Sequence, residues 1–139
     1  MGRIIAHKYR DLDKSSNMSI LRDFVNLLRL QVNVYHNAKV CGAWGIHEDR
    51  PGIASFHIVT IGSCMIDIPG MWRTELNLGD LVIFPRGIKH SMEPVKALDG
   101  PQQHLSYNSS QEGTGLLCGE VQVFKIQNGH LLDALPSVV

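Results

Sequence analysis

The sequence lacks a long hydrophobic run and an excess of charge of either sign. No stretch approaches the roughly 18 consecutive apolar residues of a membrane-spanning helix, and the N-terminal residues MGRIIAHKYRDLDK lack the apolar core of a secretory signal. The 13 basic and 13 acidic residues cancel to a formal net charge of zero, which provides little attraction for nucleic-acid phosphates. These absences predict a cytoplasmic protein that does not bind DNA by itself.

Cysteine is scarce, and several familiar catalytic motifs are missing. Cys41, Cys64 and Cys118 are odd in number and widely spaced, which indicates reduced thiols rather than a disulfide framework. The chain has no G-x-S-x-G elbow, phosphate-binding glycine-rich loop, H-E-x-x-H pair or Cys-x-x-Cys unit. The sequence therefore offers no candidate catalytic residue of these kinds.

The length and composition are those of one ordinary globular domain. A chain of 139 residues with 44% hydrophobic and 19% charged residues can bury one core but has no length for a second. Residues 1–18 are polar and without a clear period, so we expect an N-terminal arm followed by a single domain over residues 19–139. Ser19 begins an amphipathic pattern that predicts a short helix, with apolar positions at Ile20, Leu21, Phe24, Leu27 and Leu28.

After this helix the hydrophobic period shortens to two, which predicts β-strands. The expected strands are 31–37, 53–61, 63–68, 74–78, 80–84 and 116–126, with Gly and Pro at the turns between them. Residues 92–115 show no apolar period and are expected to form a long loop, and residues 130–135 resemble the start of a helix that Pro136 ends. We therefore predict a mostly β fold, an antiparallel β-barrel or jelly roll with a short N-terminal helix.

The sharpest local pattern is G-x5-P-x-G-x2-H, which runs from Gly79 to His90 and includes Pro85 and Gly87. An apolar strand leads into a Pro-Gly turn, which returns the chain and His90 to the barrel. The pattern resembles the second sequence motif of the cupin superfamily at every fixed position up to its histidine. The asparagine that ends that motif is replaced by Pro94.

The first cupin motif is less complete in this chain. In metal-dependent cupins, H-x-H followed by a glutamate supplies three of four metal ligands. Here the corresponding segment is His57-Ile58-Val59, with one histidine and no glutamate in the next several residues. The resemblance therefore carries only His57 and His90 onto ligand positions of the superfamily.

The wider sequence resembles the N-terminal, effector-sensing cupin domain of AraC-type transcriptional regulators over about residues 19–139. That resemblance implies a homodimer, with DNA bound only through a C-terminal helix-turn-helix domain that is absent from this chain. The supporting segments, in order, are LLRL from Leu27, WG from Trp44, SFHIV from Ser55, GSC from Gly62, the Gly79–His90 motif, LLCG from Leu116 and LLDALP from Leu131.

Four residues are candidates for one metal site, namely His36, His57, His90 and Cys118. Alternation places His36 on the same face as Val32 and Val34, and each of the other candidates also lies in or beside an apolar strand. Imidazole and thiolate ligands in a closed tetrahedral site favour zinc, although another divalent transition metal is compatible with them. The alternative is that each of the four is a hydrogen-bonded residue of the core or of a pocket.

We favour an effector- or redox-sensing domain of an AraC-type regulator, responding to a small molecule or an oxidant through a metal site inside the barrel. The first alternative is a free-standing metal-dependent cupin enzyme acting on a small metabolite. The second is a dimerisation module with an empty barrel. Nothing in the sequence identifies the effector or the regulated genes.

Overall fold

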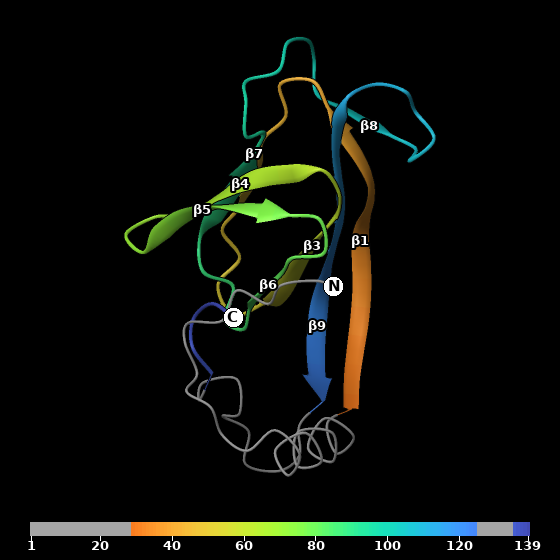
Figure 1. Ribbon diagram of the computed structural model, residues 1–139. Helices are drawn as coiled ribbons and strands as arrows, with labels where there is room; N and C mark the ends of the chain where they lie inside the picture. The colour runs from red at the N-terminus through yellow and green to blue at the C-terminus, as the bar shows by residue number, and fades with distance from the viewer. Residues whose placement is uncertain (1–28, 125–134) are drawn as a thin grey trace, which may run out of the picture.

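The computed structural model describes residues 29–124 and 135–139, and these residues form antiparallel β-sheets (Figure 1). The predicted arm at 1–18 and the helix from Ser19 lie outside the described residues, as does nearly all of the predicted helical segment at 130–135. Within the described ranges no helix is long and apolar enough to cross a membrane.

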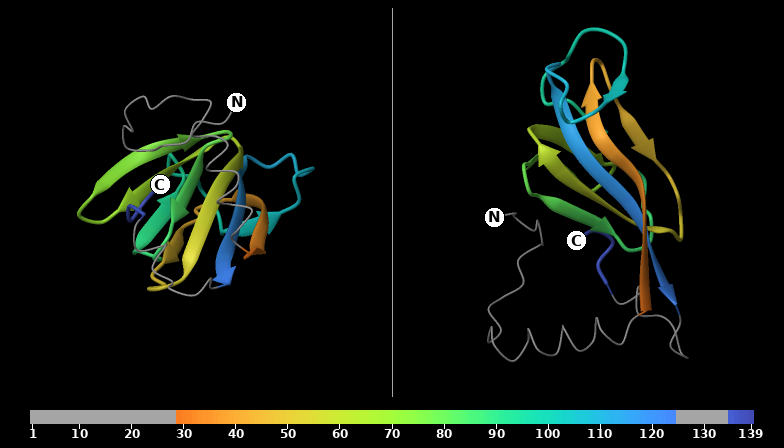
Figure 2. Two further views of the ribbon diagram at one scale, coloured as in Figure 1. Left: turned by 90° about the horizontal axis from the view of Figure 1, so that it is seen from below. Right: turned by 90° about the vertical axis from the view of Figure 1, so that its right-hand side faces the viewer.

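The strands of the described part form two sheets, which Figure 2 shows from two further sides. The five-stranded sheet has the order β6-β3-β9-β1-β8, and the four-stranded sheet has the order β2-β7-β4-β5. The mostly β, antiparallel fold predicted from the sequence is confirmed. The strands span β1 (Arg29–Cys41), β2 (Ile46–Glu48), β3 (Ala54–Ile61), β4 (Ser63–Ile68), β5 (Trp72–Asn77), β6 (Leu81–Phe84), β7 (His90–Glu93), β8 (Gln103–Leu105) and β9 (Gly113–Phe124).

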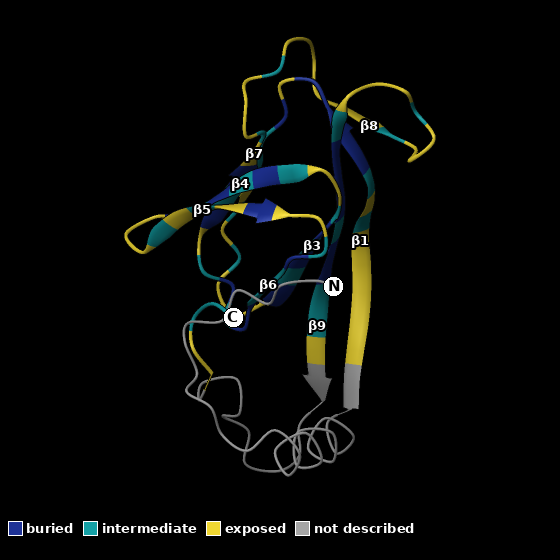
Figure 3. Ribbon diagram, in the orientation of Figure 1, coloured by how far each residue is buried: buried dark blue, intermediate teal, exposed yellow. Residues whose placement is uncertain are grey.

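The hydrophobic core is built by strands of both sheets. Strand β4 alternates half-buried and buried positions along its whole length, as a strand with one face in a core should. The buried residues of the core cluster come from β1, β3, β4, β5, β6, β7 and β9 and include Val40, Val59, Ile66, Leu76, Phe84, Met92 and Leu116. Figure 3 shows this burial on the inner strands and the exposure of the lower part of β1.

The segment predicted as a loop at 92–115 contains additional strand structure. Strand β7 ends within it, β8 occupies Gln103–Leu105, and β9 begins at Gly113. All three residues of β8 are exposed or half-buried, and they pair with the end of β1. A short, polar edge strand formed by backbone pairing alone has no hydrophobic period, which explains why the sequence pattern did not show it.

Strand β1 contains an irregularity that changes which side chains face the core. Its pairing with β9 shifts register between Val34 and His36, as at a β-bulge. Val32 and Val34 are 54% and 47% exposed, so they do not form a core-facing row with His36. The alternation used to predict that shared face is therefore wrong in this part of the strand.

The Pro-Gly turn of the sequence motif lies close to the segment that follows β2. Gly87 has a positive φ of 66°, and its backbone N–H donates to the Phe84 carbonyl at 3.3 Å. A Cβ atom on Gly87 would lie 2.0 Å from the Arg50 carbonyl oxygen and 2.6 Å from that of Ile53. The turn thus packs backbone against backbone and places His90 at the start of β7.

Replacing Gly87 with Ala should lower the free energy of unfolding by at least about 2 kcal/mol, because left-handed strain and a backbone collision add together. Gly70→Ala is the matched control. Gly70 also has a positive φ, 76°, but an added Cβ atom there meets nothing within 4 Å, so only the strain of about 1 kcal/mol is expected. Urea denaturation of both variants measures the difference, and equal losses would contradict the close approach at Gly87.

Candidate metal centre

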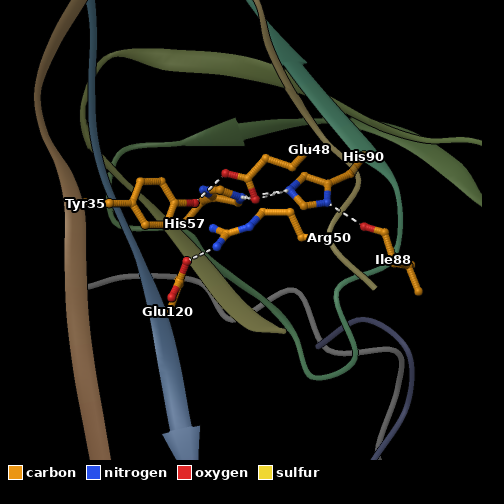
Figure 4. Close-up of polar contacts among 7 residues, drawn as sticks. All are labelled: Tyr35, Glu48, Arg50, His57, Ile88, His90 and Glu120. Carbon is orange, nitrogen blue, oxygen red and sulfur yellow. Dashed lines mark hydrogen bonds and ion pairs between the residues drawn. The ribbon is translucent and has the colours of Figure 1, made fainter. Parts of the chain in front are cut away.

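Two of the predicted ligands meet inside the protein. His57 lies on β3 and is fully buried, and His90 begins β7 with 2% exposure. Their Nε2 atoms are 2.8 Å apart. The other ring nitrogen of His90, Nδ1, lies 2.8 Å from the Ile88 carbonyl oxygen and donates its hydrogen to it. Figure 4 shows the two imidazoles pointing toward each other from separate strands.

A carboxylate completes this group. Glu48 ends the short strand β2, and the pairing of β2 with β7 places it directly opposite His90. Its Oε2 atom lies 3.5 Å from Nε2 of His90 and 3.7 Å from Nε2 of His57. In the described part of the chain, Glu48, His57 and His90 are the three residues whose potential ligand atoms all lie within 4.8 Å of one another.

Hydrogen bonds within the described residues leave this cluster incompletely satisfied. Nδ1 of His90 donates to Ile88, so in the tautomer that leaves Nε2 of His90 as an acceptor, the hydrogen between the two Nε2 atoms belongs to His57. His57 Nδ1 is then an acceptor, and it is buried without a partner, as is Oε2 of Glu48. An unpartnered buried carboxylate oxygen is costly, so a cation that takes a lone pair from Oε2 of Glu48 suits the cluster. Ligation through Nε2 of His57 would move its hydrogen to Nδ1, which has no hydrogen-bond partner among the described residues in either tautomer.

The donor spacing agrees with a shared metal ion. Two ligand atoms on one ion with bonds of about 2.1 Å lie roughly 3 to 3.5 Å apart at octahedral or tetrahedral angles. The observed separations of 2.8, 3.5 and 3.7 Å bracket that range. Two imidazoles and one carboxylate are a set used for zinc and for non-haem iron. These residues therefore fit a divalent transition metal.

The protonation states favour metal binding at neutral pH. Burial would raise the pKa of Glu48, but hydrogen bonding by the His90 and Tyr35 side chains, together with the charge that the two imidazoles carry when protonated at low pH, lowers it to about 2. Burial lowers the pKa of His57 to about 4, with the charge of Glu48 opposing the shift. The cluster consequently offers an ionised carboxylate and an unprotonated His57, which are the states that ligate metals.

Apolar and aromatic packing holds the imidazoles in place. The ring of Phe84 stacks on that of His90 with centroids 3.8 Å apart and planes 6° from parallel. The same phenylalanine meets His57 edge to face at 5.9 Å. Since Phe84 and His90 flank the Pro-Gly turn, the sequence motif fixes the imidazole and its aromatic neighbour together.

The two remaining predicted ligands lie outside this group of three. His36 directs Nδ1 to the Leu116 carbonyl at 3.0 Å and Nε2 to Nδ1 of His104 at 3.0 Å. Cys118 is buried on β9, and its backbone pairs with both His36 and His57. Burial, with a smaller effect from the charge of Glu48, raises the pKa of the Cys118 thiol to about 12. The set of four ligands proposed from the sequence stays a prediction.

Sequence reasoning overlooked Glu48. The cupin pattern directs attention to a glutamate after the first histidine, whereas Glu48 precedes His57 and lies on a strand of three residues. A strand of three residues is too short to be recognised from an alternation of apolar and polar side chains. The one available signal was the alternation of Ile46 and Glu48 with exposed His47, which places the carboxylate on the inward side.

Comparisons with known proteins place the chain in a family. The family described as Cupin matches residues 20–139, and the chain therefore belongs to the cupin family. Among solved structures, a cupin superfamily protein from Desulfitobacterium hafniense is similar, with 8% sequence identity and a TM-score of 0.40. That match covers 70% of this chain and 79% of the other. No curated protein matches the sequence.

The metal-free protein should lose stability as the pH falls from about 6.5 toward 4. His57 has a pKa of about 4 in the fold against 6.5 as its ordinary value, so the unfolded chain binds the extra proton first in this range. The loss is of the order of 3 kcal/mol. Urea denaturation at several pH values measures it, and His57→Gln should show a smaller pH dependence. An equal pH dependence in that variant would contradict the assignment to His57.

Proposed function

We propose that this cupin domain binds a divalent transition metal, zinc in the first instance, through Glu48, His57 and His90. The observation that carries the proposal is the convergence of three potential ligand atoms within 4.8 Å in the protein interior. The unpartnered state of Glu48 Oε2 supports it independently. When bound, the metal would supply a Lewis-acidic centre, while the protein residues hold its ligands in position.

We further propose that the domain senses an effector or an oxidant for an AraC-type transcription regulator and acts as a homodimer. The ordered sequence segments that resemble such regulators support this assignment. The burial of the three donor side chains, with exposures of 0%, 1% and 10%, also supports it. A deeply enclosed site suits a change of metal occupancy that alters the fold better than turnover of a bulky substrate.

A free-standing metal-dependent cupin enzyme is the second candidate. The specific observation in its favour is that the cluster supplies three protein ligands rather than four. A zinc site with three protein ligands keeps a position open for water or substrate, which is the arrangement of catalytic rather than structural zinc. In that case Glu48, His57 and His90 would orient the bound molecule from the protein side.

Metal analysis of the freshly purified chain tests the proposed ligand set. The wild-type protein should hold close to one metal ion per chain, and Glu48→Gln, His57→Ala and His90→Ala should each weaken binding by more than about 100-fold, because each removes a ligand. Cys118→Ser and Cys64→Ser are the matched controls, since both residues are buried cysteines outside the group of three. If Cys118→Ser loses metal and Cys64→Ser does not, the result would favour the four ligands predicted from the sequence, which include Cys118.

Sedimentation and cobalt spectroscopy separate the two functions. A sensor should show a dimer equilibrium at tens of micromolar protein that differs between the zinc-loaded and chelator-treated states. An enzyme with an open position should instead bind azide, which would change the visible spectrum of the cobalt-substituted protein. A sedimentation profile unaffected by zinc, together with a spectral response to azide, would contradict the sensor proposal and favour the enzyme.

A further inference from the structure

A tyrosine outside the group of three donors contacts the carboxylate of Glu48. The hydroxyl of Tyr35, on β1, donates a hydrogen bond to Oε1 of Glu48. The other oxygen, Oε2, faces the Nε2 atoms of His57 and His90 and has no hydrogen-bond partner. The two oxygens of one carboxylate therefore contact different residues, as Figure 4 shows.

We propose that Tyr35 is a positioning residue that engages Oε1 of Glu48 and presents Oε2 alone to the metal, so that Glu48 ligates through a single oxygen. This inference rests on the proposed function, because it presupposes that Glu48, His57 and His90 hold a metal. Outer hydrogen-bond partners of metal ligands orient the ligand and tune the site, and their loss commonly weakens metal binding by about 10 to 100-fold.

The placement of Tyr35 depends on the irregularity in β1. The pairing of β1 with β9 shifts register between Val34 and His36, and Tyr35 is the residue between the two registers. A bulge of this kind redirects one side chain relative to its neighbours. Tyr35 is still 43% exposed, so its hydroxyl reaches Glu48 from the outer side of the cluster rather than from the core.

A charged pair lies beside the tyrosine ring and Glu48, as Figure 4 shows. The guanidinium of Arg50 lies 5.9 Å from the centroid of the Tyr35 ring, within the range of a cation–π contact. Arg50 also forms an ion pair with Glu120 on β9. Three elements thus hold the tyrosine against Glu48, namely β1 itself, the segment after β2, and β9.

The test compares zinc affinity in Tyr35→Phe and Tyr107→Phe. Tyr107 is the matched control because it is similarly exposed, at 37% against 43%. Its hydroxyl also donates one hydrogen bond, to Oδ1 of Asn37 at 2.7 Å. Competition with a chromophoric chelator should show that Tyr35→Phe raises the zinc dissociation constant by about 10 to 100-fold. Tyr107→Phe should leave it unchanged within about twofold.

The cobalt spectrum distinguishes positioning from a general effect on the fold. Without the Tyr35 hydroxyl, Oε1 of Glu48 is free to join Oε2 on the ion, which raises the coordination number. The visible bands of cobalt-substituted Tyr35→Phe should therefore weaken and shift relative to the wild type, while those of Tyr107→Phe should not. Urea denaturation of both metal-free variants should show similar, small losses of stability.

Three other outcomes would overturn the inference about Tyr35, and they can be told apart. Wild-type affinity and spectrum in Tyr35→Phe would overturn it and leave the metal site intact. A large loss of metal-free stability in Tyr35→Phe, with an unchanged spectrum, would make Tyr35 a structural residue and also overturn it. Failure of the wild-type protein to bind zinc or cobalt would overturn the proposed function and this inference together.

Discussion

The group of three donors joins the two sheets of the domain. Glu48 and His90 face each other on the paired strands β2 and β7 of the four-stranded sheet, whereas His57 comes from β3 of the five-stranded sheet. Three polar side chains are thereby directed into an interior that is otherwise largely apolar. Because buried polar groups need partners, neighbouring residues supply hydrogen bonds to two of these side chains, Tyr35 to Glu48 and Ile88 to His90.

This position between the sheets would tie metal binding to the fold. A ligand that binds the native state and not the unfolded chain raises the free energy of unfolding. The increase grows with the logarithm of the ratio of free ligand concentration to dissociation constant. An ion held by both sheets would also oppose their separation. Occupancy of this enclosed site by a metal would therefore be measurable as a change in the stability of the whole domain.

The sequence predicted the features that have a period or a fixed spacing. Alternation identified most of the long strands, and the Gly79–His90 motif led to His90 and to the turn that places it. Glu48 and strand β8 could not be predicted in this way, because both depend on backbone pairing between segments far apart in the chain. The irregularity at Tyr35 likewise follows from how β1 fits β9, which alternation along one strand does not reveal.

The pairing of β1 with β9 also has a consequence for how the domain acquires its fold. These strands contact each other from Arg29↔Phe124 to Cys41↔Gly113, so the partners are separated by most of the chain. Proteins dominated by such distant pairings fold slowly, because a large loop must close, with a loss of chain entropy, before the contacts form and offset that loss. During synthesis β1 must wait for β9 to leave the ribosome. Until then its backbone hydrogen-bonding groups lack the partners that β9 supplies and are exposed to incorrect pairing.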